Sequence, residues 1–156
     1  YEMTSSLVGS EMCIRDRKHT QWSPDLIYFN NREVKPTTGY YVQKLYGQNA
    51  GSHYIPSQII LDNQDNRVKL RIGSSIVRDS KTGDVIVKLV NLLPVSVETE
   101  IQLPGIGSVQ PSAVRTVLAG APESTPLPVT DTIEVGANFK QQLPAYSFTV
   151  IRLKTK

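Results

Sequence analysis

The sequence is poor in residues that could form covalent or metal cross-links. Cys13 is the only cysteine among 156 residues, so the chain can form neither an internal disulfide nor a cysteine cluster for a metal. It also lacks any run of about 18 apolar residues, the length that a helix needs to cross a bilayer. We therefore expect no disulfide framework and no membrane partner, whereas the cellular compartment stays open.

Aromatic residues and net charge are scarce as well. Aromatics make up 7% of the chain, and the formal net charge is only +3. The Lys and Arg residues are scattered along the sequence, which is typical of solvated sheet faces and argues against a nucleic-acid partner. With 39% hydrophobic and 20% charged residues, the composition is that of a soluble globular protein with about one ordinary domain.

The first seventeen residues differ from the rest of the chain. Residues 1–17 (YEMTSSLVGSEMCIRDR) show no helical or strand period, and they lack the basic start and apolar run of a secretory signal. The string SSLVGSEMCIRDR closely resembles translated sequencing-adapter DNA fused to a reading frame. A native disordered arm is the alternative. We treat the segment as artefactual or disordered and leave it out of the fold prediction.

Residues 18–52 contain one predicted strand and one predicted helix. The apolar run 25–29 (DLIYF), between Ser-Pro and Asn-Asn, predicts a strand buried on both faces, as in parallel sheets. Thr37 or Thr38 can cap the helix that follows, and its apolar stripe is Tyr41, Val42, Leu45 and Tyr46. One strand–helix unit cannot bury both of its apolar faces, so we expect it to belong to a larger α/β structure. In this chain we expect the uncovered apolar residues 26–29 to cause non-specific association.

The remainder, 53–156, changes to an all-β pattern. Apolar and polar residues alternate in 68–72 (VKLRI) and 95–102, whereas 84–91 is nearly all apolar and predicts a central strand. Further strands are expected at 113–119, 131–135 and 146–153, with turns at 62–66, 80–84, 104–105 and 122–128. About seven short strands without a helix predict a β-sandwich of jelly-roll type.

Several strings in residues 18–156 resemble one enzyme family. HTQWSPDLIYFNN and TTGYYVQKLYGQNAG look like the end of the catalytic barrel of family 51 α-L-arabinofuranosidases, and LPAYSFTVIRL resembles the last strand of their C-terminal β domain. The resemblance implies a mainly β fold: a C-terminal β-sandwich preceded by the last strand–helix unit of an incomplete (β/α)8 barrel. Residues 25–29 would form the eighth barrel strand.

The same resemblance implies a chemistry that this chain does not itself contain. The family hydrolyses terminal α-L-arabinofuranosyl residues of arabinan and arabinoxylan with retention, using two glutamates on the fourth and seventh barrel strands. Both would lie upstream of residue 18, so we expect no catalytic residue in this chain. No cofactor or metal is implied. The parent is expected to bind arabinose-containing polysaccharide and, by family habit, to form a homo-oligomer and to be exported.

Trp22 and Asp25 are the candidate substrate-binding residues. The resemblance places Asp25 nearest a polar subsite position, where a carboxylate can accept hydrogen bonds from sugar hydroxyls, and Trp22 can stack on a sugar ring. Both can equally serve as barrel packing or capping residues. Asn30 and Asn31 follow the strand and are more typical of a turn, and Glu33 is more typical of a polar loop than of a site.

Other polar residues favour structural roles. Glu98 and Glu100 are two residues apart on one strand face, about 7 Å between Cα atoms, but Ser96 and Gln102 mark that face as solvated. His19 and His53 have no companions at metal-ligand spacing. The turn 62–66 (DNQDN) lacks the glycine and distal glutamate of a calcium loop, which favours a hairpin turn.

Two alternatives to the enzyme fragment remain. The first is an isolated carbohydrate-binding β-sandwich, which the low aromatic content and the placement of Tyr40, Tyr41 and Tyr46 in the helix disfavour. The second is a structural domain of another glycosidase, against which the W-x-P-D-L-I string argues.

Overall fold

The computed structural model describes residues 26–29 and 32–155. Within them the chain is mainly β, as predicted, with one three-turn helix and one short helix. The helices are α2 (Thr38–Gln48) and α3 (Asn66–Lys69). The strands are β1 (Ile27–Phe29), β2 (Val34–Pro36), β3 (His53–Ile55), β4 (Ile72–Arg78), β5 (Val85–Asn91), β6 (Val97–Gln102), β7 (Val109–Ala119), β8 (Val129–Glu134), β9 (Asn138–Leu143) and β10 (Ser147–Thr155).

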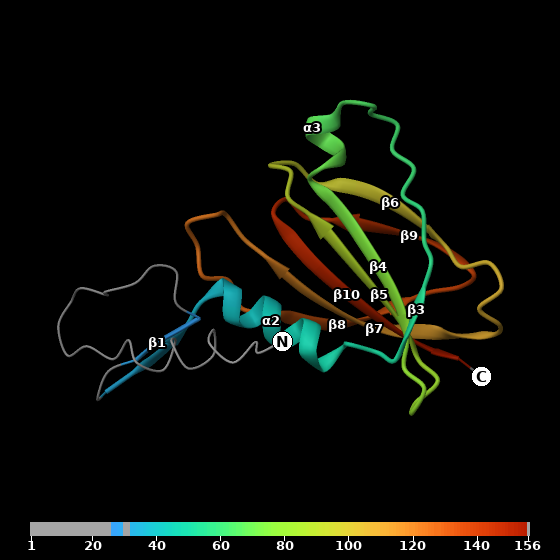
Figure 1. Ribbon diagram of the computed structural model, residues 1–156, viewed down its shortest axis with the longest axis horizontal. Coiled ribbons are helices and arrows are strands. Elements are labelled where there is room, and N and C mark those ends of the chain that lie inside the picture. The colour runs from blue at the N-terminus through green and yellow to red at the C-terminus, as the bar shows by residue number, and fades with distance from the viewer. Residues whose placement is uncertain (1–25, 30–31, 156) are drawn as a thin grey trace, which may run out of the picture.

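The strands form three antiparallel sheets. The largest has six strands in the order β3-β4-β5-β10-β7-β8, and the pairs β6-β9 and β1-β2 form two small sheets. The described residues build three layers: the β6-β9 pair covers one face of the large sheet, and α2 lies across the other (Figure 1). The β1-β2 hairpin extends away from these layers (Figure 1).

Strand β5 shows why the large sheet is covered on both faces. Its odd-numbered apolar residues, Val85, Val87 and Leu89, pack towards β6 and β9 with Ile101 and Leu143. Ile86 instead packs towards α2. A strand with core on both sides must be apolar at nearly every position, which confirms the prediction of a central strand at 84–91.

Helix α2 docks on the sheet through the predicted apolar stripe. The Thr37 side chain caps the helix by accepting a hydrogen bond from the Tyr40 N–H, as expected for one of the two threonines. Leu45 is buried against the sheet, with Tyr41 and Val42 beside it. The Tyr46 ring stacks on Phe148 at a centroid distance of 4.8 Å. The helix therefore finds its apolar partner within this chain.

One polar side chain is fully enclosed at the end of the sandwich. Asn91 has no exposed surface. Its amide nitrogen donates to the carbonyl oxygens of Val95, Leu143 and Pro144, and its Oδ1 accepts from the Leu93 N–H. Both ends of the side-chain amide are thus hydrogen-bonded, and Asn91 connects the end of β5 to the β9–β10 turn.

The prediction of a strand at 68–72 was wrong. Asn66–Lys69 is helical instead, and β4 begins only at Ile72. The Asp65 side chain caps this turn by accepting from the Arg67 N–H, and its carbonyl accepts from Val68 and Lys69. The DNQDN turn therefore leads into a helix and is no hairpin turn, because a local cap outcompetes the apolar alternation.

The predicted strand at 25–29 is present as β1, and in this chain it is not buried on both faces. Strand β1 pairs with β2 antiparallel, and Phe29 lies opposite Val34. Phe29 remains 36% exposed and Val34 64% exposed. In the described residues only β2 is a hydrogen-bonding partner for β1, so the hairpin replaces the parallel neighbours that the apolar run predicted.

Candidate functional site

The predicted substrate-binding residues lie outside the described structure. Trp22 and Asp25 precede the first described residue, Leu26, and Asn30 and Asn31 fall in the gap between β1 and β2. Their role as subsite residues therefore stays a prediction. Glu33 is described: it is exposed, and its carboxylate lies 3.3 Å from the Lys35 amine.

The described acidic residues are committed to ion pairs or face solvent. Glu98 on β6 pairs with Lys140 on β9 at 2.8 Å, and this hydrogen bond holds the pKa of Glu98 below its usual value. Glu100 accepts from the Gln102 amide at 2.9 Å. Both glutamates are exposed on the outer face of the β6-β9 sheet, which supports their assignment as solvated residues.

A second carboxylate pair is held at the edge of the sandwich. Asp131 on β8 accepts two hydrogen bonds from the guanidinium of Arg115 on β7, which lowers the pKa of the Asp131 carboxyl. The same guanidinium donates to Gln141 on β9 at 2.8 Å. Arg115 therefore links the two sheets of the sandwich. Its ion pair with Asp131 keeps that carboxylate ionised.

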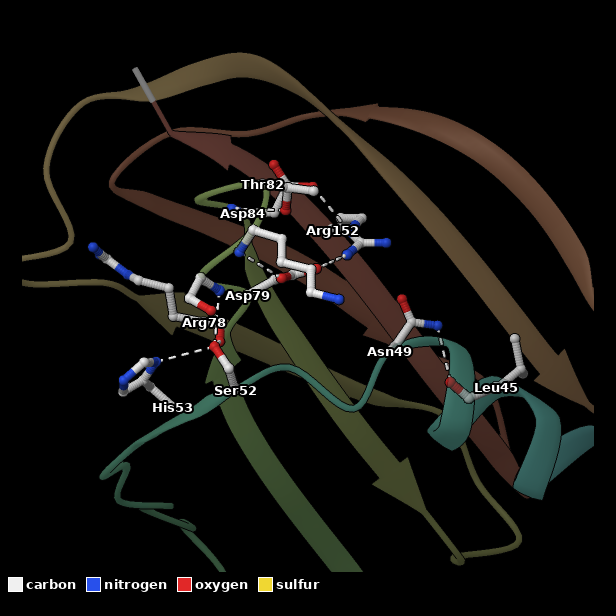
Figure 2. A network of polar contacts seen from close by, with 11 residues as sticks. Leu45, Asn49, Ser52, His53, Arg78, Asp79, Thr82, Asp84 and Arg152 are labelled. Carbon is white, nitrogen blue, oxygen red and sulfur yellow. Dashed lines mark hydrogen bonds and ion pairs between the residues drawn. The ribbon is translucent and has the colours of Figure 1, made fainter.

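Figure 2 shows a polar network at the turn between β4 and β5. Arg152 on β10 donates to Asp79 at 3.0 Å, and its Nε lies 2.9 Å from an oxygen of Asp84. Ser52, which follows α2, joins the network by donating to the Arg78 carbonyl and accepting from the Ser80 N–H. The network connects the segment after α2, the β4–β5 turn and β10, and the Arg152 guanidinium forms ion pairs with both aspartates.

No pattern in the sequence indicates this network. Arg152 and Asp79 are 73 residues apart, and each occupies an ordinary polar position in an alternating strand or a turn. Only the pairing of β10 with β5 brings them together. The cluster is best explained as a structural one because Arg152 forms ion pairs with both aspartates and thereby connects β10 to the β4–β5 turn.

An apolar groove of about 280 Å³ opens between the sheets at the β4 side. The segment 55–60, strand β4 and the residues 99–106 line it. Glu100 is the only carboxylate among its lining residues. A retaining glycosidase needs two carboxyl groups roughly 5 Å apart, so the groove as described has no catalytic pair.

No metal site is found in the residues that the structure describes, since no three His, Cys, Asp or Glu side chains gather there. The His53 ring hydrogen-bonds the neighbouring Ser52 hydroxyl at 3.0 Å, and His19 lies outside the described range. No described helix is long and apolar enough to cross a membrane.

These observations define a class of protein first. In the described residues, a two-sheet antiparallel sandwich with a helix against the outer face of its larger sheet matches the C-terminal region of glycoside hydrolases. No family model matches the chain. The solved structures and the curated relative narrow the class further.

The chain is related to family 51 α-L-arabinofuranosidases and matches their C-terminal portion. It is 31% identical to the arabinose-bound MgGH51 α-L-arabinofuranosidase, with a TM-score of 0.75, over 88% of this chain and 22% of that enzyme. It is 40% identical over 45 residues to an extracellular exo-α-L-arabinofuranosidase of Streptomyces chartreusis, which is 29% of this chain and 6% of that protein.

A more distant structure shares the fold alone. The α-L-arabinofuranosidase of Thermotoga maritima in complex with arabinose is 13% identical, with a TM-score of 0.68, over 82% of this chain and 31% of that one. The chain thus spans less than a third of the length of each of these relatives.

Proposed function

We propose that this chain is the C-terminal part of a retaining α-L-arabinofuranosidase that removes terminal α-L-arabinofuranosyl residues from arabinan or arabinoxylan. The similarity to MgGH51 over 88% of the chain carries the proposal. The catalytic glutamates belong to the part of such an enzyme that precedes these residues. This chain contributes the scaffold that holds the end of the barrel.

Under this proposal the chain divides at the helix–sheet junction. Residues 18–52 are the terminal strand–helix unit of the barrel, and 53–156 form the sandwich. Strand β3 begins at His53 and pairs with β4 of the large sheet, which supports the division. Leu45 and Tyr46 of the helix pack against the sandwich at Val150 and Phe148. Burial of apolar surface at such a contact contributes on the order of 25 cal/mol per Å².

Activity measurements on two proteins test the proposal. Purified residues 18–156 are expected to release no arabinose from a nitrophenyl arabinofuranoside, because the catalytic glutamates of such an enzyme lie in the part that precedes these residues. A longer protein, made by restoring the in-frame coding sequence upstream of residue 18, is expected to be active. Turnover by residues 18–156 alone, or an upstream sequence without a barrel bearing two glutamates, would contradict the proposal.

The subsite residues are tested in the restored protein. We propose that Asp25 accepts hydrogen bonds from the sugar and that Trp22 stacks on it. Asp25→Asn is expected to raise KM or lower kcat by about tenfold or more, the usual effect of losing a charge-assisted hydrogen bond. Glu33→Gln is the matched control, because Glu33 is exposed and paired with Lys35. Equal effects of both changes would remove Asp25 from the site.

A further inference from the structure

Lys88 on β5 is a buried cation without a counter-ion among the described residues. It is only 3% exposed, and the Tyr46 ring of α2 lies over its amine at 5.1 Å from the ring centre. No described residue forms a hydrogen bond or an ion pair with that amine. Burial lowers the pKa of Lys88, and no acid counteracts it. Lysines are almost never buried to this extent unless they are paired.

The elements around Lys88 supply no acid that could pair with it. Its cross-strand neighbours are Ser75 on β4 and Val150 on β10, and α2 contains no acidic residue. Arg152, two residues further along β10, is a second cation and already holds the two aspartates of the β4–β5 turn. Glu134 is on β8, three strands away from β5. The described structure therefore leaves the charge of Lys88 uncompensated.

Small residues flank Lys88 on the β4 side. Ser75 lies directly opposite Lys88, and Gly73 is two residues before Ser75 on the same face of the sheet. A Cβ added at Gly73 would meet only Val90 within 4 Å, at 3.8 Å. The space above this part of β4 is therefore open to a side chain from another part of a larger protein.

Tyr46 points from α2 towards this open part of the sheet. Its ring stacks on Phe148, and Phe148 lies in one row with Val90 and Gly73 across β10, β5 and β4. Tyr46 is 40% exposed, although it covers the Lys88 amine. A side chain that arrives over Gly73 thus has a path to the amine past the edge of the Tyr46 ring.

The orientation of α2 places the rest of the proposed barrel over the same region. The helix crosses the strands of the large sheet: Thr38 at its start donates to the Ser124 carbonyl beyond β7, and Gly51 after its end lies against Val77 of β4 (Figure 1). Helices of a (β/α)8 barrel form a ring, so the last helix has a neighbour on each side. Packed helices are about 8–10 Å apart, or about three residues along a strand. A ring neighbour on the Tyr46 side therefore lies over β4 and β5.

We propose that Lys88 binds the carboxylate of an aspartate or glutamate in the part of the parent protein that precedes these residues, and that this acid arrives beside α2 over Gly73 and Ser75. The inference rests on the proposed function, because the proposed barrel supplies the acid. The partner is a carboxylate because a buried ammonium needs an opposite charge that also accepts a hydrogen bond. Lys88 is then a specific contact between the sandwich and the barrel.

Replacement of Lys88 by methionine tests the ion pair, because its effect should differ in sign between two proteins. In the 156-residue chain, Lys88→Met removes an uncompensated charge and should raise the midpoint of thermal unfolding by about 3 °C. In the restored protein it leaves a buried carboxylate without a partner, and should lower the midpoint at which the sandwich unfolds by about 5 °C or more. Lys69→Met is the matched control: Lys69 is exposed on α3, away from α2 (Figure 1), so its replacement should change neither midpoint appreciably.

Cross-linking with a carbodiimide, which joins an amine to a carboxylate in direct contact, identifies the partner. Peptide mass spectrometry of the restored protein is expected to find Lys88 joined to an acid encoded upstream of residue 18. A cross-link from Lys88 to an acid within residues 26–155 would overturn the proposal, and so would the same shift of both midpoints on Lys88→Met. A destabilisation of the restored protein that disappears on dilution would assign the acid to a second copy and overturn the barrel as its source.

Arabinose release by the restored protein separates this inference from the proposed function. An active protein that Lys88→Met stabilises would overturn the ion pair alone. An inactive protein that Lys88→Met destabilises would retain the ion pair and remove the proposed function. An upstream sequence without a barrel would overturn both.

Discussion

At the scale of single residues, Gly47 and Gly51 differ in the atoms that surround them. Gly51 has a φ of +69°, and a Cβ there would lie 2.6 Å from Val77 Cγ2. Gly47 is within α2, and a Cβ there would meet nothing within 4 Å. We expect Gly51→Ala to destabilise the chain by about 2 kcal/mol or more, because it adds left-handed strain to an overlap with the sheet.

Gly47→Ala is the control for this prediction. It is expected to stabilise the chain by about 0.5 kcal/mol, since alanine favours a helix where space is open. Urea unfolding followed by circular dichroism measures both changes. A Gly51→Ala variant as stable as the parent chain would show that the segment between α2 and β3 is not held against Val77. Gly47 lies inside α2 and Gly51 follows it, a difference that only the structure reveals.

At the scale of elements, the contact between α2 and the large sheet contains a buried cation. Lys88 on β5 is only 3% exposed, and its amine lies 5.1 Å from the centre of the Tyr46 ring. Helix α2 carries no acid; its one charged residue is Lys44, and Arg152 on β10 is already paired with Asp79 and Asp84. Burial therefore lowers the pKa of Lys88.

This burial predicts a pH-dependent cost to stability. Because the folded chain disfavours the protonated amine, the unfolded chain binds more protons between the lowered pKa and the ordinary lysine value, so stability rises with pH across that interval. We expect Lys88→Met to stabilise the chain by about 1 kcal/mol at neutral pH. The gain should shrink as the pH rises through the interval.

Unfolding at a series of pH values measures this effect, with Lys44→Met as the control. Lys44 is exposed on α2, so its replacement should change stability little at any pH. A Lys88→Met variant that is less stable than the parent at neutral pH would mean that the attraction between the amine and Tyr46 exceeds the cost of desolvation.

Elements with a strong period could be predicted from the sequence. β5 and β10 could be predicted because they are apolar along most of their length. α2 could be predicted from its Thr37 cap and from the apolar stripe that includes Leu45. β9 was missed because NFKQQL is polar, and its buried Gln141 and Leu143 are recognisable only once β6 is beside them. α3 was missed because the Asp65 cap competes with an alternating pattern.

At the scale of the whole molecule, the candidate site was predicted only through the resemblance. No composition or spacing in the described residues indicates sugar hydrolysis, because the acids found there pair with nearby cations or face solvent. The sandwich could be predicted from alternation, whereas the antiparallel β1-β2 hairpin could not. A strand of three residues has too few side chains to specify its pairing partner.

The β1-β2 hairpin therefore leaves apolar surface uncovered. Phe29 and Val34 face each other across the two strands and both remain exposed. We expect the double variant Phe29→Ser/Val34→Ser to bind less of a hydrophobic dye and to aggregate less at high concentration than the parent chain. Its midpoint of urea unfolding should move little, because neither residue belongs to the two core clusters.

Leu127→Ser is the matched control for the hairpin variant. Leu127 is 67% exposed on the stretch before β8 and lies outside both core clusters, so its replacement should alter dye binding much less. Scattered exposed apolar residues are normal on a protein surface, whereas adjacent ones mark a contact site. If dye binding were unchanged in the double variant, or if its free energy of unfolding fell by more than about 1 kcal/mol, the hairpin would be part of a packed core and not an uncovered edge of a larger structure.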